Sequence, residues 1–383
     1  MRLAGAALLA SLALGCRHAA PVPADTLAAL ARRPGAHLAG EVTSLAPAAV
    51  LNRTDFVWTL EFSPDGSRVA FTQLGAQAYA LGLWALGPPP TRLAEPRLNL
   101  LEWDVEALAF SPDGAHVAVA SRDATVRLYD AATGALEATH TAAEPLVSVA
   151  FHPGGQALAV GGTGGLISVL SLPALTPVAQ VHGHADVVSA LAFEPSSGTL
   201  ISGSWDRRII AWSLSDGLAE LRAFTFPWHV NDLTLDARGR RLGVAFSQGK
   251  AERTRDLYQR EKRGEVEPAQ DGNAAAVVDA LTGKLLGTWH PHAGVVASAA
   301  ISPDGRSLAS GGWDKRVVVT DTAGKGEPVE LRDFGWSVRR VRFSRDGRHL
   351  GVAAWTPQNP VGDHESDPSA AVYRVGYQDA KVE

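Results

Sequence analysis

The chain has 383 residues, which is enough for two average domains or for one unit of a repeat or propeller architecture. Charged residues make up 20% of it and the formal net charge is -5. This balance argues against a nucleic-acid-binding protein, because such proteins present a basic patch or stripe. A single cysteine excludes an internal disulfide, so the fold must rest on its core.

Residues 1–15 predict a secretory signal peptide. Arg2 precedes an apolar run over residues 3–14, which is too short to cross a bilayer as a helix. The sequence ALGC ends at Cys16 and resembles a bacterial lipobox, whose cysteine becomes lipid-modified and N-terminal. We therefore expect export to the bacterial cell envelope and a membrane anchor through lipid on Cys16. The alternative is an ordinary signal peptide with a chance cysteine.

Residues 16–38 predict the lipidated tether between membrane and domain, because the stretch after Cys16 holds three prolines and no strand alternation. Arg17 stands where many lipoproteins of the inner membrane carry an aspartate. This difference favours the outer membrane, although the choice of leaflet varies between bacteria.

One short motif recurs along the rest of the chain. The sequence FSPDG and its degraded copies begin at seven reference residues: Phe62, Phe110, Phe151, Phe193, Leu235, Ile301 and Phe343. Successive copies are 48, 41, 42, 42, 66 and 42 residues apart. The period is therefore near 42 residues, with one large insertion, and a period of this size is typical of repeat architectures.

Each copy predicts a β-hairpin followed by two more strands. Alternating apolar residues such as VEALAF precede the motif and HVAVAS follows it, so the Pro-Asp-Gly segment predicts a type I turn closed at positive φ. A third strand such as TVRLYD and a turn such as ATGAL lead to the fourth. Four strands per period predict an all-β fold, a seven-bladed β-propeller of four-stranded antiparallel blades over residues 39–378.

Ring closure also follows from the sequence. After the third strand of the last blade, AAVYRVGY, too few residues remain for a turn and a fourth strand. Residues 41–51, EVTSLAPAAVL, precede the first blade and have strand character. We predict that this N-terminal strand completes the last blade and leaves no open sheet edge.

The repeat resembles the WD40 family over residues 39–378. In that family a structural tetrad joins aspartate, histidine, serine and tryptophan by hydrogen bonds, which a buried polar group requires. Counted from Phe193, the resemblance assigns the tetrad to His184, Ser202, Asp206 and Trp212. Asp206 is accordingly expected to be structural and not a general base.

The other repeats are divergent. The repeat at Ile301 keeps His292, Ser310 and Asp314 but has Thr320 in the tryptophan position. The repeat at Phe110 keeps only Asp123, with Tyr129 in that position. The remaining blades are expected to depend on apolar packing between neighbouring sheets.

Six tryptophans fall at two repeated offsets. Three stand twelve residues after a reference residue, in the loop that the family places on its top face, and three stand seven residues before one: Trp205, Trp313, Trp355, Trp103, Trp228 and Trp336. If they form one exposed aromatic surface, they are candidate partner-binding residues, because tryptophan is a favoured interface anchor. The alternative is that these indoles seal loops over the blade ends.

Two long insertions, residues 249–272 and 356–368, are expected on the same face. Residues 362–367, GDHESD, could suggest a metal site, but a charged loop is the preferred interpretation. The chain has no Gly-rich phosphate loop, no GxSxG and no HExxH. We therefore expect no metal site, no cofactor and no catalytic residues.

Together these features predict an exported, lipid-anchored, non-catalytic propeller, monomeric, that binds a protein or peptide at its top face and binds no nucleic acid. An envelope hydrolase or lactonase is one alternative, and it would need carboxylates or histidines converging on the propeller centre. A glycan-binding module is the other, since indoles also stack on sugars. The sequence leaves the partner and the role of both insertions open.

Overall fold

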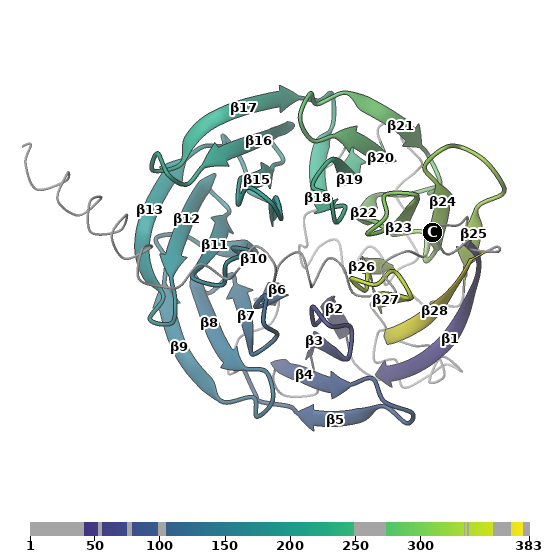
Figure 1. The fold of residues 1–383 in the computed structure, drawn as a ribbon, viewed down its shortest axis with the longest axis horizontal. Helices are drawn as coiled ribbons and strands as arrows, with labels where there is room; N and C mark the ends of the chain where they lie inside the picture. Colours follow the sequence, from purple (N-terminus) through teal and green to yellow (C-terminus); the bar gives the residue numbers. More distant parts are fainter. Residues whose placement is uncertain are drawn as a thin grey trace, which may run out of the picture. The chain divides into compact units, whose positions relative to one another are not determined.

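A computed structural model describes residues 42–52, 56–74, 79–98, 105–248, 273–332, 334, 337–354 and 369–377. These residues form seven separate four-stranded antiparallel sheets, and their strands are numbered β1 to β28 in chain order. The sheets stand as blades around a common axis (Figure 1). The prediction of an all-β, seven-bladed propeller is confirmed.

In six blades the strands follow in chain order from the axis outward, and in the seventh the first strand of the chain is the outermost (Figure 1). The inner strands are β2 (Phe56–Phe62), β6 (Val105–Phe110), β10 (Leu146–Phe151), β14 (Ala190–Phe193), β18 (His229–Leu235), β22 (Val296–Ile301) and β26 (Val338–Phe343). The second strands are β3 (Arg68–Leu74), β7 (His116–Ser121), β11 (Ala157–Gly162), β15 (Leu200–Gly203), β19 (Arg241–Ser247), β23 (Ser307–Gly312) and β27 (His349–Ala354).

The third strands are β4 (Tyr79–Ala85), β8 (Thr125–Asp130), β12 (Leu166–Ser171), β16 (Arg208–Ser213), β20 (Ala274–Asp279), β24 (Val317–Asp321) and β28 (Ala370–Tyr377). The outer strands are β5 (Thr91–Ala94), β9 (Leu136–Thr141), β13 (Thr176–His182), β17 (Ala219–Thr225), β21 (Leu285–Trp289), β25 (Val329–Leu331) and β1 (Val42–Asn52). Blades 1 to 7 are numbered by their inner strands in chain order.

The recurring motif builds the turn between the first two strands. In blade 1, Ser63 Oγ donates to Asp65 Oδ1 at 2.6 Å, and the same carboxylate accepts the N–H of Ser67 at 3.0 Å. Gly66 then adopts φ +70°, a left-handed conformation that glycine tolerates without strain. We call this side of the propeller the bottom; the turns between second and third strands and the connections between blades lie on the top.

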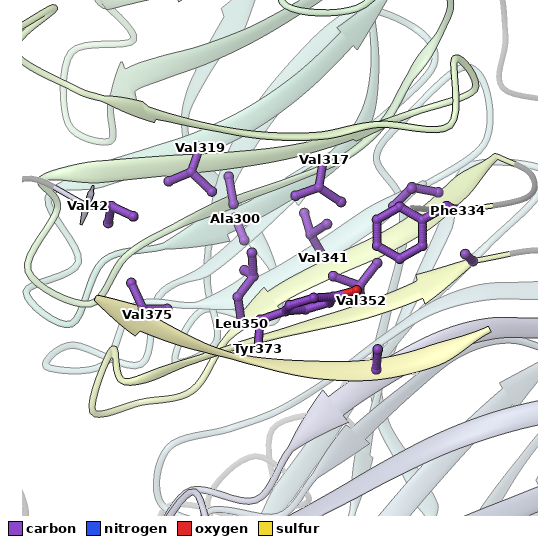
Figure 2. Packing of buried hydrophobic residues seen from close by; sticks show 14 residues of the cluster. Val42, Ala300, Val317, Val319, Phe334, Val341, Leu350, Val352, Tyr373 and Val375 are labelled. Carbon is purple, nitrogen blue, oxygen red and sulfur yellow. The ribbon is translucent and has the colours of Figure 1, made fainter. Parts of the chain in front are cut away.

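Apolar side chains pack between neighbouring blades and form the core. Figure 2 shows the cluster between blades 6 and 7, where Val317 and Val319 face Leu350, Val352 and Tyr373. Successive side chains of a strand point to opposite faces of its blade, so the inner strands of each blade pack against the blades on both sides. This packing lets blades without the full tetrad remain folded.

The first strand closes the ring, as predicted. Strand β1 pairs antiparallel with β28, with Leu45 opposite Val375 and Asn52 opposite Ala370. Val42 joins the core cluster between blades 6 and 7 (Figure 2). Closure by a strand from the other end of the chain leaves blade 7 with the same four-stranded sheet as the other blades.

Candidate binding site at the propeller axis

A cavity of about 50 Å³ lies at the axis, and we call it the axial cavity. Its lining comes from inner strands and from top connections of several blades: Glu106, Arg122, Val147, Val187, Ser189, Trp205, Asn231, Ala297, Arg339 and Arg340. An ordered water needs about 10 to 15 Å³ of space measured in this way. The cavity is therefore large enough for a small chemical group and too small for a folded segment.

The repeat explains why these side chains meet. Six lining residues stand four positions before their reference residues, at the same level of successive inner strands: Glu106, Val147, Ser189, Asn231, Ala297 and Arg339. The seventh residue at this offset is Trp58 of blade 1. Equivalent positions of a closed ring converge on its axis, so one offset supplies a whole ring of side chains.

Trp205 and two valines form the apolar wall of the axial cavity. Trp205, Val147 and Val187 pack together as a small cluster apart from the cores between blades. The backbone N–H of Trp205 donates to the carbonyl of Val187 at 3.1 Å, which fixes the top turn against the connection entering blade 4. In blade 6, Trp313 N donates to Val295 O at 3.0 Å in the same way.

Charged residues form another part of the lining. Arg122 occupies in blade 2 the offset that Trp205 occupies in blade 4, and its Nε lies 2.6 Å from Glu106 Oε1. The side chain of Arg122 is 33% exposed, whereas Glu106 is buried. A solvent-reachable guanidinium is thereby oriented at the cavity by a buried carboxylate.

Arg339 is held by aromatic rings. Its guanidinium carbon lies 5.2 Å from the centroid of Trp313 and 5.9 Å from that of Trp58, within the range of cation–π contacts. The residue is only 2% exposed. Trp58 and Trp313 therefore support a cation at the cavity wall.

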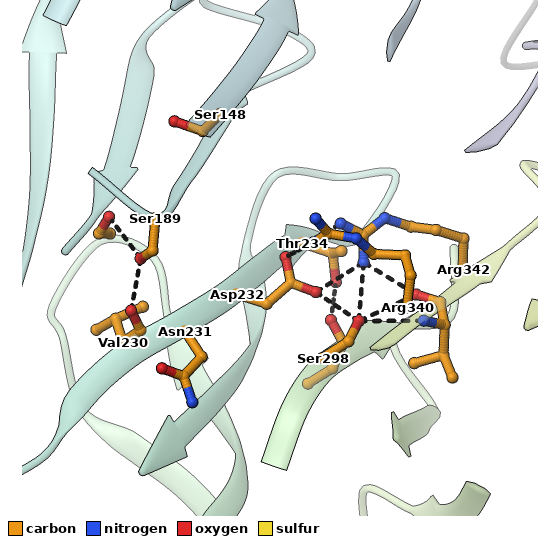
Figure 3. A network of polar contacts seen from close by, with 12 residues as sticks. Ser148, Ser189, Val230, Asn231, Asp232, Thr234, Ser298, Arg340 and Arg342 are labelled. Carbon is orange, nitrogen blue, oxygen red and sulfur yellow. Dashed lines mark hydrogen bonds and ion pairs between the residues drawn. The ribbon is translucent and has the colours of Figure 1, made fainter. Parts of the chain in front are cut away.

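A buried ionic network adjoins the cavity (Figure 3). Asp232 of blade 5 accepts hydrogen bonds from Arg340 Nη1 at 2.9 Å and from Arg342 Nη1 and Nη2 at 2.8 and 3.0 Å. Ser298 Oγ of blade 6 donates to the same carboxylate at 2.6 Å. Arg342 Nε also lies 3.2 Å from Glu61 of blade 1. One network therefore joins blades 5, 6, 7 and 1.

The network keeps Asp232 ionised. Burial alone would raise the pKa of this carboxyl, but the two guanidinium groups and the Ser298 hydroxyl lower it to about 2. For Arg342 burial opposes the charge, and the carboxylates of Asp232 and Glu61 outweigh it and raise the pKa. The ions thus stabilise one another at the centre of the propeller.

The tetrad residues of blade 4 lie in a continuous hydrogen-bonded chain. His184 Nδ1 is 2.9 Å from Asp206 and Nε2 is 2.7 Å from Ser202 Oγ, which accepts the indole N–H of Trp212 at 2.8 Å. Burial raises the pKa of Asp206, but the contact with His184 and two backbone N–H groups hold it below its usual value. Both carboxylate oxygens of Asp206 are engaged, since Oδ2 also accepts the N–H of Ala185 and Oδ1 accepts that of Arg208.

Blade 6 has a shorter chain of the same kind. His292 lies 2.8 Å from Asp314 and 2.9 Å from Ser310 Oγ. Arg316 approaches Asp314 at 2.8 Å. Burial raises the pKa of Asp314, yet His292, a backbone N–H and Arg316 bring it to about 2.

The predicted tryptophans that the structure describes differ in burial and in their neighbours. Trp205 and Trp313 are each only 7% exposed, so the expectation of openly exposed indoles is wrong for these two. Neighbouring valines cover Trp205, and Arg339 covers Trp313. Trp228 is half-buried, with its ring 5.8 Å from that of Phe246. Of the three, only Trp205 lines the axial cavity.

Several predictions lie outside the described residues: Trp103, Trp336, Trp355, Cys16, residues 1–38, and both insertions with the GDHESD segment. Within the described part of the chain, no group of three His, Cys, Asp or Glu side chains is placed to hold a metal ion. No helix in that part meets the length and apolarity that a membrane span requires.

The sequence did not single out Glu106, Arg122, Arg339 and Arg340, although a signal for them was present. Glu106 and Arg339 share the offset four before the reference residue, and Arg122 shares the offset of Trp205. The segment VRRVRF also places three arginines on an inner strand, where the equivalent strands are mostly apolar.

Comparison with known proteins supports the repeat assignment. Three segments match the family described as WD domain, G-beta repeat: residues 100–130, 175–213 and 283–321. The WD40 repeat protein poxJ of Penicillium oxalicum is 31% identical over 117 residues, which is 29% of this chain and 34% of that protein. The protein of that name from strain 114-2 / CGMCC 5302 gives the same values. The chain is a seven-bladed β-propeller in which three segments match WD40 repeats.

These matches cover only part of the chain and of its relatives. The chain spans about a third of the length of these curated relatives. The three matched segments cover the blades that keep tetrad residues, namely Asp123 in blade 2, Asp206 in blade 4 and Asp314 in blade 6. The WD40 propeller fold is consistent with a protein-binding scaffold.

Proposed function

We propose that this WD40 propeller is an exported, lipid-anchored, non-catalytic scaffold that binds a protein or peptide partner at the axial cavity. The observation that carries the proposal is the lining of that cavity, where Trp205 meets a charged wall on a rigid ring of strands. Binding sites combine an apolar anchor with a few placed polar groups in this way.

The charged groups support binding more than catalysis. Asp232 shares its carboxylate among two arginines and a serine, and Glu106 is paired with Arg122. A general base needs a carboxylate or imidazole within reach of a substrate proton, and these groups are already engaged. The alternative of a hydrolase therefore finds no support at the axial cavity.

A glycan ligand is also less favoured here. Stacking on a sugar needs an open indole face, whereas Trp205 and Trp313 are each 7% exposed. A partner side chain that enters the cavity needs only the edge of Trp205 and the neighbouring valines. The geometry therefore supports a peptide group over a sugar ring.

The place where the chain joins the ring suits a lipid tether. Val42 begins β1 opposite Tyr377, whose hydroxyl donates to Gly347 O in the bottom hairpin of blade 7 at 2.6 Å. The segment before Val42 thus joins the propeller on the bottom, opposite the top turn of Trp205.

The lipid anchor is tested by fractionation. Cys16→Ser is expected to move the protein from the membrane to the soluble envelope fraction, because each buried methylene of a lipid contributes about 0.8 kcal/mol to membrane binding. Retention of the variant on the membrane contradicts the anchor.

Partner binding is tested by crosslinking and pull-down from intact envelopes with wild type, Trp205→Ala and the control Trp289→Ala. Trp289 is partly buried on the outer strand β21, away from the axial cavity. We expect the partner to be lost with Trp205→Ala and kept with Trp289→Ala. Thermal melts must accompany both, because truncating a buried tryptophan costs about 3 to 5 kcal/mol of stability. Equal recovery by both folded variants contradicts the proposed site.

A further inference from the structure

The bottom of the propeller carries charge of opposite sign on its two sides. In blades 5, 6 and 7 the turns between first and second strands, with the strand residues that flank them, hold six exposed arginines: Arg238, Arg240, Arg241, Arg306, Arg345 and Arg348. We call this surface the basic half. The bottom turns of blades 2, 3 and 4, with their flanking strand residues, contain no lysine or arginine. They hold four carboxylates, which form the acidic half: Asp113, Asp130, Glu194 and Asp216.

Carboxylates in the same turns do not cancel the charge of the basic half. Each of its three turns contains one buried or half-buried aspartate: Asp236, Asp304 and Asp346. Arg348 Nε lies 3.9 Å from Asp346 Oδ2, which is the one ion pair that the structure describes for the six arginines. The turns between third and fourth strands of blades 5 and 6 add two lysines and three acids: Lys284, Lys325, Asp279, Asp321 and Glu327. Cations therefore outnumber carboxylates by eight to six on the described bottom of these blades.

The three turns of the basic half touch one another. The N–H of Ala237 in blade 5 donates to Pro303 O in blade 6 at 3.0 Å. Arg241 Nη1 donates to Gly305 O, a neutral acceptor, at 2.8 Å, so this contact orders the guanidinium without cancelling its charge. A Cβ added at Gly347 in blade 7 would lie 3.7 Å from Pro303 Cδ. The basic half is therefore one continuous surface across three blades.

The chain enters the ring beside the basic half. Val42 lies opposite Tyr377, whose hydroxyl donates to Gly347 O in the bottom turn of blade 7. Arg345 and Arg348 belong to the same turn. An attachment that precedes Val42 thus reaches the propeller next to exposed arginines and not at the acidic half. Clusters of arginine and lysine at such a place are attracted by the negative surface potential of anionic lipids.

We propose that the basic half lies on a membrane surface and binds the phosphate groups of anionic phospholipids. This inference rests on the proposed function, because it assigns the side of the propeller that the lipid anchor holds against the bilayer. The acidic half is repelled by the same lipids, so the contact is confined to blades 5 to 7. A basic surface adds the second signal that a single lipid chain needs for stable anchoring. Alone it binds weakly, so Cys16→Ser is still expected in the soluble fraction.

The test measures cosedimentation of the full chain with lipid vesicles. Every protein carries Cys16→Ser, so that no lipid chain contributes. Vesicles of phosphatidylcholine measure attachment through other parts of the chain, such as the apolar residues 3–14. Vesicles of equal parts phosphatidylcholine and phosphatidylglycerol add anionic headgroups. We expect about tenfold tighter binding to the second kind, because each arginine near an anionic surface contributes to binding. The preference should shrink as salt is raised.

Two matched variants locate the contact. Arg238→Gln/Arg306→Gln removes two exposed arginines of the basic half and is expected to remove most of the preference for phosphatidylglycerol. The control Arg208→Gln/Arg332→Gln changes the net charge equally at the top of blades 4 and 6. It should keep the preference of the parent protein. Thermal melts confirm that both variants are folded.

Four results would overturn the membrane contact. They are equal binding to both kinds of vesicle, equal loss in the variant and its control, competition by soluble glycerol phosphate, and a dimer of the free protein that Arg238→Gln/Arg306→Gln abolishes. Competition would indicate a discrete phosphate site, and the dimer would place the acidic half of a second copy on the basic half. Light scattering detects such a dimer.

The proposed function is tested separately from the basic half. The vesicle preference can fail while the fractionation of Cys16→Ser and the recovery of a partner through Trp205 give their expected results. If Cys16→Ser instead stays on envelopes through a high-salt wash while the vesicle preference holds, the lipid anchor fails and the basic half stands.

Discussion

Two buried polar networks stabilise this propeller, and they connect residues over very different distances in the sequence. The tetrad of blade 4 stays within one blade, where His184 and Asp206 are 22 residues apart. The axial network crosses blades, since Arg342 is 110 residues from Asp232 and 281 from Glu61. The tetrad makes one sheet rigid, whereas the axial network fixes four blades relative to one another.

The two networks also differ in what their loss leaves behind. Without Asp206, His184 loses one partner and keeps its contact with Ser202 Oγ. Without Asp232, the guanidinium groups of Arg340 and Arg342 cannot lose their charge at any ordinary pH. The axial network is therefore expected to contribute more to stability and to respond more sharply to substitution.

The largest loss of folding stability is expected for Asp232→Ala. Removing one partner of a buried ion pair leaves an uncompensated charge and costs about 3 to 5 kcal/mol. The carboxylate is only 1% exposed, so water cannot replace it easily. Urea unfolding measures the loss, and a change below about 1 kcal/mol contradicts the importance of the axial network.

Acid should weaken the same network. The pKa of Asp232 is lowered from 3.8 to about 2 by its partners, so its contribution is complete above pH 3.8 and is lost as the pH falls through 2. The expected loss is about 2 kcal/mol. Asp232→Asn should lack this part of the pH dependence. Parallel stability curves for the two proteins between pH 5 and 2 would exclude Asp232 as its source.

Asp206→Ala tests the tetrad. The variant leaves the buried His184 without its carboxylate and is expected to lose about 1 to 3 kcal/mol. Thermal or urea unfolding gives the value. Wild-type stability accompanied by a lost activity would show instead that Asp206 belongs to a functional site.

Arg208→Gln should cause the smallest loss of folding stability. Arg208 pairs with Glu220 at 3.3 Å, and both side chains are about a third or more exposed. Such surface pairs contribute at most about 1 kcal/mol. The variant is the reference for substitutions in blade 4. If it lost as much unfolding free energy as Asp206→Ala, the surface pair would matter as much as the tetrad contact, which contradicts this account.

The fold could be predicted because its determinants repeat. The Ser-Pro-Asp-Gly turn needs only neighbouring residues, and its copies fixed the blade count and the position of each inner strand. The closing strand could be predicted because residues 41–51 have strand character and precede the first blade. The tetrad followed from the resemblance, since its four residues keep fixed offsets within one repeat.

The axial cavity could not be predicted in the same way. Asp232, Ser298 and Arg342 belong to three repeats, and Asp232 and Arg342 differ from their equivalents in the other blades. Their contact depends on the size of the closed ring, which no single repeat encodes. The offset of Trp205 placed it correctly on the top turn. Its low exposure depends on Val147 of blade 3 and on Val187, which lies in the connection entering blade 4.

The central claim is that the axial cavity, and not the rim of the propeller, contacts the partner. A photo-crosslinking amino acid placed at Val187, beside Trp205, tests it most directly when compared with the same group at Leu286 on the outer strand β21. Leu286 is 46% exposed and lies away from the cavity. In intact cells we predict a discrete polypeptide adduct from position 187 and none from position 286. Adducts from position 286 alone would contradict the claim and place the partner on the rim.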